Sequence, residues 1–251
     1  MITAARRILS AVCLLLAASP RLLAQAPAPP PAAPPDPLTA TASAGLALTS
    51  GNTDTSTLNL GYGFAYDPKT RNLIRSEGLY LHGKSEGELT ADRLALNGRD
   101  EYKLRDGLFT FGQLQYLRDQ FKDIDYLVAP TAGLGYRLFD TPRTQLSLDG
   151  GFGVVWEKAP LRDVQTSGAV TFGEKLAHQL SPTAALTESF SALYKTADFN
   201  DALYAFSTTL AASVTARTQV KIEFLDTYKN LVAPTIENND IALIVGMVFK
   251  R

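Results

Sequence analysis

The sequence predicts an all-β protein, a transmembrane antiparallel up-and-down β-barrel of about 12 strands. Three observations predict this fold class. Large apolar side chains alternate with small or polar ones along most of the chain after residue 38. The small or polar face holds few lysine and glutamate residues. The connections between alternating segments are in turn short and long, as in bacterial outer-membrane barrels.

The clearest alternation runs from Ser56 to Tyr66, where large apolar residues occupy the even positions between Leu58 and Tyr66. A period of two is that of a β-strand with two different faces. The strands predicted in this way are residues 40–50, 55–66, 71–82, 91–104, 108–118, 127–138, 144–157, 164–178, 184–196, 202–214, 219–229 and 240–250. A soluble sandwich also alternates, but a face of Gly, Ala, Ser, Thr and Asn is more typical of a lumen than of a solvated surface.

The connections between these strands form two sets. The tight set holds the Pro, Gly and Asp of turns and comprises residues 67–70, 105–107, 140–143, 180–183 and 215–218. The second set is mostly longer and more charged and comprises residues 83–90, 119–126, 158–163, 197–201 and 230–239, with 51–54 as a short exception. Short turns are periplasmic and long loops extracellular in bacterial barrels, which places both chain ends in the periplasm.

The residues before the barrel predict export. Arg6 and Arg7 precede an apolar run over residues 8–18, and Ala24-Gln25-Ala26 offers a cleavage site, so residues 1–26 have the pattern of a signal peptide. The run is shorter than the ~20 apolar residues of a membrane-spanning helix. Residues 27–38 are rich in proline and predict an extended periplasmic linker, which leaves residues 39–251 for the barrel.

Composition excludes several classes of function. The only cysteine, Cys13, lies in the predicted signal peptide, so the mature chain has no disulfide. Of 24 basic residues three lie in residues 1–26, against 25 acidic residues in all, so the mature net charge is −4. This charge argues against a nucleic-acid partner, which needs a basic face. The sequence shows no phosphate-cradling loop and no dinucleotide fingerprint, so we expect no cofactor.

Metal binding has little support in the sequence. The two histidines, His82 and His178, are far apart in the chain. Asp119, Asp123 and Asp125 lack the glycine and the final glutamate of a calcium loop. We therefore expect no metal site.

Aromatic residues near the strand ends predict two belts at the membrane interfaces. The belt near the short turns comprises Tyr66, Tyr102, Tyr136 and Phe249, and the belt near the long loops comprises Tyr80, Tyr116, Trp156, Tyr194, Tyr204 and Tyr228.

Several strands fit the alternation poorly. Leu73, Leu79 and Leu81 share their parity with Arg75 and Glu77, which predicts either a bulge or a leucine cluster inside the lumen. The remaining misfits are Phe109 and Phe111, which share parity with glutamines, and Asp100 and Glu188, which fall on the apolar parity.

Charged residues on the lumen parity are the candidate functional residues. They are Arg75, Glu77, Arg93, Arg99, Glu101, Arg137, Asp149, Glu157, Lys175, Lys195, Lys221 and Glu223. Such charges can line an aqueous path and set ion selectivity, or they can pair with one another and plug the barrel. Twelve strands lie between the filled eight-stranded barrels and the open sixteen-stranded porins, so both interpretations stay open.

A lipid-hydrolysing site on the outer wall is a third interpretation. If the 67–70 turn sets even positions opposite even ones, Ser56 lies beside His82 near the long loops. A triad also needs a polar residue to orient the imidazole. The apolar parity of the next strand offers only Leu94 and Leu96 there. We therefore expect no enzyme and no catalytic residue.

Three segments resemble a known family, the YdiY-like salt-induced outer-membrane proteins. They are Ser50-Gly51-Asn52-Thr53-Asp54-Thr55-Ser56-Thr57-Leu58-Asn59-Leu60, then Tyr116-Leu117-Arg118-Asp119-Gln120-Phe121 with Asp125-Tyr126, and Gly133-Leu134-Gly135-Tyr136-Arg137. The resemblance covers residues 41–251 and implies an outer-membrane barrel, without an established activity or catalytic residue. One departure is the end Phe249-Lys250-Arg251, because many outer-membrane proteins end on the aromatic residue that the assembly machinery recognises.

The sequence thus predicts a barrel in the outer membrane, with a narrow pore for small solutes or ions as the leading function. A closed structural barrel is the alternative, and a lipid-active enzyme is the third. The expected partners are outer-membrane lipid and lipopolysaccharide, the barrel-assembly machinery through the C-terminal strand, and small solutes or ions.

Overall fold

The structure is a computed structural model that describes residues 37–50, 55–85, 88–234 and 236–250. The predicted signal peptide and most of the predicted linker lie outside the described residues. The strands are β1 (Leu38–Ser50), β2 (Thr55–Tyr66), β3 (Asn72–Ser85), β4 (Glu88–Lys103), β5 (Leu108–Asp119), β6 (Ile124–Asp140), β7 (Thr144–Lys158), β8 (Gln165–Ser181), β9 (Ala184–Lys195), β10 (Asp198–Ser213), β11 (Thr218–Lys229) and β12 (Asn239–Lys250). One 3₁₀ turn, η1 (Gln120–Lys122), lies between β5 and β6.

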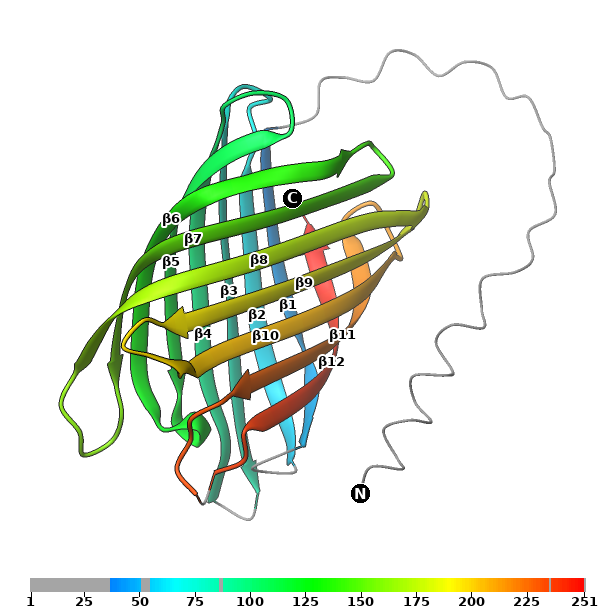
Figure 1. The fold of residues 1–251 in the computed structure, drawn as a ribbon. Helices are drawn as coiled ribbons and strands as arrows, with labels where there is room; N and C mark the ends of the chain where they lie inside the picture. Colours follow the sequence, from blue (N-terminus) through cyan, green and yellow to red (C-terminus); the bar gives the residue numbers. More distant parts are fainter. Residues whose placement is uncertain (1–36, 51–54, 86–87, 235, 251) are drawn as a thin grey trace, which may run out of the picture. The chain divides into compact units, whose positions relative to one another are not determined.

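The twelve strands form one closed barrel in which every strand pairs antiparallel with its neighbours in sequence (Figure 1). The ring closes where β1 pairs with β12, with Thr41 opposite Lys250 and Ser50 opposite Ile241. An even number of strands lets an antiparallel sheet close on itself without leaving an edge. The predicted fold class and strand number are confirmed.

Ten of the twelve strands are longer than the alternation predicted, while β2 has the predicted bounds and β9 is one residue shorter. β3 and β4 extend to Ser85 and from Glu88, where a loop over residues 83–90 was predicted. Likewise, β6 begins at Ile124 and β10 at Asp198, both inside predicted loops. Backbone pairing with a neighbouring strand continues beyond the stretch where side-chain polarity alternates, so the sequence pattern ends before the ladder does.

The barrel has two ends, which we call the turn end and the loop end. The turn end holds the short connections, such as residues 104–107 between β4 and β5, and both β1 and β12 reach it at Leu38 and Lys250. The loop end holds the other connections that the structure describes, including η1 and residues 159–164. Figure 1 shows the end of β12 at the turn end, among the hairpins of β6–β7, β8–β9 and β10–β11.

One face of every strand carries apolar side chains outward. On β2, for example, Leu58 and Leu60 are exposed while Asn59 between them is fully buried. All ten predicted belt residues lie on this outer face, six of them near the loop end and four near the turn end. Among the described residues, no helix is long and apolar enough to cross a membrane.

The register explains the misfitting strands. Leu79 and Leu81 of β3 point inward and pack with Leu225, Ala242 and Ile244, so the leucine cluster is present in the lumen. The one register shift of β3 against β4 lies at Gly83 and Lys84, beyond these leucines. Asp100 and Glu188 do lie on the outer face, opposite Ile74 and Leu176 respectively.

Candidate functional site

The turn-end half of the lumen holds a cavity of about 1060 Å³. It reaches the turn end at Asp67 and Lys103 and ends toward the loop end at Arg93, Leu127 and Leu225. The cavity is therefore a cup, open to solvent at the turn end, whose floor lies near the middle of the barrel.

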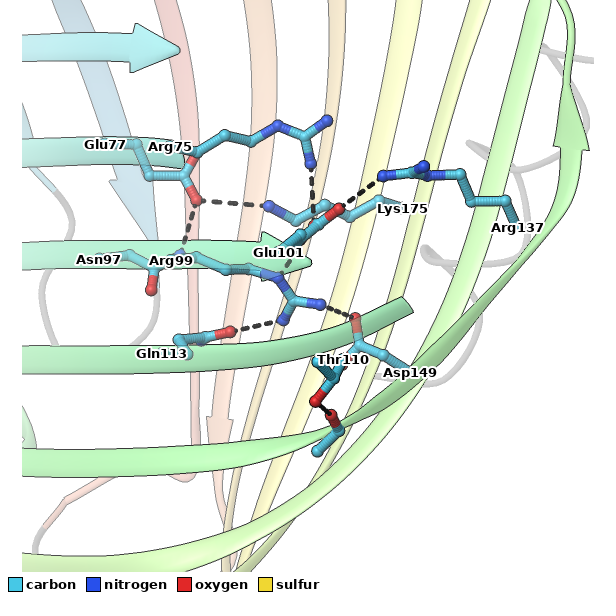
Figure 2. A network of polar contacts seen from close by, with 11 residues as sticks. Arg75, Glu77, Asn97, Arg99, Glu101, Thr110, Gln113, Arg137, Asp149 and Lys175 are labelled. Atoms are coloured by element: carbon cyan, nitrogen blue, oxygen red, sulfur yellow. Dashed lines mark hydrogen bonds and ion pairs between the residues drawn. The ribbon is translucent and has the colours of Figure 1, made fainter. Parts of the chain in front are cut away.

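A network of arginines and carboxylates covers one wall of this cavity (Figure 2). The carboxylate of Glu101 accepts hydrogen bonds from three guanidinium groups. Arg75 Nη1 donates to Glu101 Oε1 at 3.1 Å, Arg99 Nε to the same oxygen at 3.0 Å, and Arg137 Nη2 to Oε2 at 2.9 Å. Three positive groups thus share one buried carboxylate, and the network keeps excess positive charge at this point.

Arg99 is the buried centre of the network. It also donates from Nη1 to Gln113 at 2.7 Å and from Nη2 to Asp149 at 2.8 Å. Its guanidinium carbon lies 3.8 Å from the centroid of the Phe111 ring and 5.8 Å from that of Phe109. Hydrogen bonds therefore hold the N–H edge of the guanidinium and the aromatic ring of Phe111 contacts its flat face, so its position is fixed.

Glycines make room for these two phenylalanine rings. A Cβ atom on Gly135 would overlap the Phe109 ring, and one on Gly133 would lie 2.8 Å from the Phe111 ring. Arg137, two residues after Gly135, has its guanidinium carbon 5.1 Å from the centroid of the Phe109 ring. The segment from Gly133 to Arg137, which carries part of the family resemblance, therefore builds the pocket in which the aromatic–arginine stack sits.

A second contact crosses the lumen in the same half. Lys175 Nζ on β8 lies 3.7 Å from Glu77 Oε1 on β3, and Asn97 Nδ2 donates to the same oxygen at 3.0 Å. β3 and β8 are five positions apart around the ring of twelve strands, so this ion pair spans most of the lumen. On β11, Lys221 and Glu223 pair at 2.9 Å.

The loop-end half of the lumen is packed instead of open. One apolar cluster consists of residues from five consecutive strands, β5 to β9. They are Leu117, Ile124, Leu127, Ala129, Val155, Ala169 and Leu193. Leu127 and Ala129 are 2% and 0% exposed. Together with the cluster around Leu81 and Ile244, these side chains fill the lumen beyond the cavity floor.

Ion pairs close the barrel beyond the apolar layer. Glu157 Oε1 accepts from Lys229 Nζ at 2.7 Å, and Glu157 Oε2 pairs with Lys195 Nζ at 2.9 Å. All three side chains are less than one-tenth exposed. Lys195 also bonds Asp201. Buried charges of this kind are held because each has a partner of opposite sign.

The 3₁₀ turn η1 adds the last part of this closure. The Lys122 side chain is fully buried, donates to the Glu237 carbonyl oxygen at 2.8 Å and pairs with Asp240 at 3.1 Å. Asp119 caps the turn by accepting from the Phe121 amide at 3.1 Å. Across the lumen, Arg93 Nη1 of β4 donates to Thr227 Oγ1 of β11 at 2.8 Å.

The structure thus divides the twelve predicted lumen residues into two groups. The turn-end group comprises Arg75, Glu77, Arg99, Glu101, Arg137, Asp149, Lys175, Lys221 and Glu223, and the loop-end group comprises Arg93, Glu157 and Lys195. Sequence reasoning missed Lys229, although it shares parity with Lys221 and Glu223 on the same strand. It also missed Lys122, because a residue in a predicted loop carries no strand parity that points inward.

The outer wall near the loop end differs from the prediction in two respects. The register sets even positions opposite even ones, as expected, but it places Leu58, not Ser56, opposite His82. The Ser56 side chain lies outside the part of the structure that is described. Opposite His82 on β4 stands Asp92, with 3.8 Å between His82 Nδ1 and Asp92 Oδ1, so a carboxylate lies where only leucines were expected.

Asp92 is engaged elsewhere. Its Oδ2 accepts from Arg118 Nη2 at 2.7 Å. At the other end of the barrel, His178 Nδ1 lies 2.8 Å from Thr144 Oγ1. Within the described ranges, no group of three or more His, Cys, Asp or Glu side chains has the arrangement of a metal site.

Comparisons with known proteins support the architecture. The NanC porin is 11% identical with a TM-score of 0.56, over 83% of this chain and 98% of that one. The translocator domain of the autotransporter NalP from Neisseria meningitidis is 12% identical with a TM-score of 0.52, over 84% of this chain and 88% of that one. At such identities the likeness shows the fold alone. No curated protein matches the chain in sequence.

The family described as "Protein of unknown function, DUF481" matches residues 42–250, which is nearly all of the barrel. The chain belongs to the DUF481 family.

Proposed function

We propose that the protein is an outer-membrane channel for small polar solutes or ions, with its loop end closed in this structure. The observation that carries the proposal is the cup of about 1060 Å³, lined by charged side chains, inside a closed barrel. The turn end faces the periplasm and the loop end the outside, as in bacterial barrels. The proposal also includes membership of the narrower group of YdiY-like salt-induced proteins, which is supported by the similar segments over residues 50–60, 116–126 and 133–137.

The outer wall supports a membrane location. Large apolar side chains such as Leu46, Leu134 and Phe152 are 61%, 56% and 74% exposed on the outside of the barrel. So large an exposed apolar area is unfavourable in water and is rare on soluble proteins. The same area is favourable in contact with lipid, and the tyrosines at both ends of the strands have the position of interfacial belts.

The contrast inside the barrel supports a channel over a purely structural barrel. The loop-end half shows that this chain can fill its lumen with leucine, isoleucine and valine. The turn-end half instead keeps arginines, lysines and carboxylates around water, although charges inside a membrane are costly and mark solute paths. A scaffold has no need for such a cavity.

Conduction then requires the loop end to open. The contacts that must separate are the ones that cross the lumen, namely Arg93 with Thr227, Lys122 with Asp240 and Lys229 with Glu157. Each is a hydrogen bond or ion pair of a charged group, and losing such a contact changes an equilibrium about tenfold. Single substitutions at these positions therefore shift the balance from closed to open, and the unchanged side chains of the apolar layer move apart when the loop end opens.

Single-channel recording in planar bilayers tests the proposal. The protein is purified from outer membranes, and its folding is checked by its mobility before and after boiling. We expect rare, discrete openings of the wild type and about tenfold more frequent openings of Arg93→Ala. Arg118→Ala is the matched control, because Arg118 is an arginine near the same end that pairs with Asp92 on the outer wall.

Silence would favour the closed structural barrel. If the wild type, Arg93→Ala and Lys122→Ala all fold and none conducts under either polarity, the channel proposal is wrong. We assign no catalytic step to the protein.

A further inference from the structure

We propose that the turn-end half of the lumen is an anion-binding site for small solutes that carry carboxylate or phosphate groups, with Arg75, Arg137 and Lys175 as its ligands. The inference deepens the proposed function, since it names the solute class. The site itself, however, can be tested without conduction.

The order of burial within the network carries the inference. The side chains of Arg75, Lys175 and Arg137 are 38%, 37% and 22% exposed, and all three line the cavity. The carboxylates that neutralise the network, Glu101 and Asp149, are only 5% and 9% exposed. A solute in the cavity therefore meets the cations first, while most of the negative charge lies behind them.

The number of charged groups in the network also indicates a net positive charge facing the cavity. Three guanidinium groups and one ammonium group (Arg75, Arg99, Arg137 and Lys175) face three carboxylates (Glu77, Glu101 and Asp149), which leaves one positive charge in excess. Glu77 is the exposed exception at 61%, and Lys175 and Asn97 already hold one of its oxygens. In a low-dielectric barrel a single excess charge strongly favours the opposite ion.

The arginines also keep hydrogen-bonding capacity. A guanidinium group has five N–H donors. Among the described side-chain hydrogen bonds, Arg75 and Arg137 each make one, to Glu101. The remaining donors suit the two oxygens of a carboxylate or phosphate, which guanidinium groups bind in pairs. The Phe109 ring under Arg137 holds that guanidinium in place before a ligand arrives.

Space for a ligand exists in front of these groups. Small residues line the cavity on β1 and β2, beside Arg75 of β3, namely Thr41, Ser43, Gly61 and Gly63, and on β9 and β10 across the lumen, namely Ser189, Ser191, Ser207 and Thr209. A Cβ on Gly63 would lie 2.6 Å from Thr41 Oγ1, so the wall at β1 and β2 is as thin as its backbone allows. A small dianion fits such a volume with its water.

The rim of the turn end has a net positive charge, which attracts anions toward the cavity. In the turns and strand ends of residues 67–71, 103–107, 140–143, 180–183 and 214–218 with Lys250, seven side chains are basic and three are acidic. A charged entrance of this kind raises the local concentration of the opposite ion.

The first test measures ion selectivity. The reversal potential of Arg93→Ala channels in a potassium chloride gradient is expected to show preference for chloride. Adding Arg75→Gln and Arg137→Gln changes the network from one excess positive charge to one excess negative charge, so the preference is expected to reverse to potassium. Arg118→Gln on the outer wall is the control and is expected to leave the reversal potential unchanged. Potassium preference of channels with an intact network would overturn the anion site and leave the channel proposal standing.

The second test measures binding without current. In detergent at constant ionic strength, replacing chloride with inorganic phosphate, and in a separate arm with succinate, is expected to raise the unfolding temperature of the wild type. The rise is expected to be lost in Lys175→Gln and in Arg75→Gln, and kept in Arg118→Gln. Lys175→Gln serves where Arg75→Gln folds poorly, because Lys175 is more peripheral in the network. If the rise in unfolding temperature depends on Lys175 but the barrel never conducts, the anion-site proposal stands and the channel proposal is wrong. Equal protection in all variants, or none in the wild type, would overturn the site.

Discussion

The turn end and the loop end of the barrel are built from the same strands and the same alternation, yet their interiors differ. Around the turn end, Arg75, Glu101 and Arg137 lie on the wall of an open cup. Around the loop end, Leu127, Val155 and their neighbours exclude water almost completely. The difference teaches that alternation determines which side chains point inward, whereas their size and charge determine whether the lumen is open.

The two rims also differ in charge. The turn-end rim has seven basic and three acidic side chains, as described above. The loop-end rim, over residues 84, 89–92, 118–126, 157–165, 195–201, 229–234 and 236–240, has ten acidic and seven basic ones. The barrel therefore carries an axial charge asymmetry, with its open mouth positive.

The largest predicted effect contrasts a buried carboxylate with a solvated one. Glu157→Gln leaves the buried Lys229 without a charged partner and leaves Lys195 with Asp201 alone, so we expect the free energy of unfolding to fall by about 3 kcal/mol or more. Glu77→Gln, in the water-filled half, is expected to cost less than about 1 kcal/mol. Urea unfolding in lipid vesicles measures both. Equal losses would remove the distinction between the two halves.

A smaller effect is expected from the pocket under the arginines. Gly135→Ala places a Cβ atom against the Phe109 ring, and such overpacking costs about 1–3 kcal/mol. Gly112→Ala is the control, because nothing lies within 4 Å of its Cβ position. The double variant Gly135→Ala with Phe109→Ala is expected to recover part of the loss relative to additivity. If the loss of stability in the double variant, measured from urea midpoints, equals the sum of the two single losses, the Phe109 ring does not need a glycine at position 135 to fit.

The outer wall of the turn-end half offers a stabilising substitution. Glu188 lies on the lipid-facing side opposite Leu176 and Thr208. Charges on this face are unfavourable in lipid, so Glu188→Leu is expected to stabilise the barrel by up to about 1 kcal/mol. The gain should appear in vesicles and vanish in a strongly hydrating detergent. A loss of stability in vesicles would mean that this face is covered by something other than lipid.

The smallest effect concerns pH at the turn-end rim. Partial burial raises the pKa of Asp67, but hydrogen bonds from the Lys69 backbone and side chain outweigh it and hold the pKa below its ordinary value. A carboxylate with a depressed pKa stabilises the fold above its ordinary pKa, and this contribution is lost as the pH falls through the depressed value. Because the pair is exposed, Asp67→Asn is expected to cost less than about 1 kcal/mol at neutral pH and nothing at acid pH. A pH-independent difference between the two proteins' urea midpoints would contradict this.

Much of the fold could be predicted because lipid and lumen impose opposite polarity on alternate residues. This constraint identified the twelve strands and the parity on which residues such as Arg99 and Glu157 lie. It could not show whether the lumen is open, since pairing across the ring, as in Arg93 with Thr227, depends on the barrel's shear and on side-chain reach. It also could not find Lys122, whose burial depends on the fold of η1 over the lumen.

Cysteine labelling tests most directly whether the lumen is a cup open at the turn end and closed at the loop end. In a Cys13→Ser chain, Ser189→Cys lies on the cavity wall and Ala129→Cys in the fully buried loop-end layer. A small, membrane-impermeant maleimide is applied to the folded barrel in vesicles from each side in turn. We predict rapid labelling of Ser189→Cys from the turn-end side only, and no labelling of Ala129→Cys from either side until the protein is unfolded. Labelling of Ala129→Cys as fast as Ser189→Cys, or of Ser189→Cys from the loop-end side, would contradict the closed loop end.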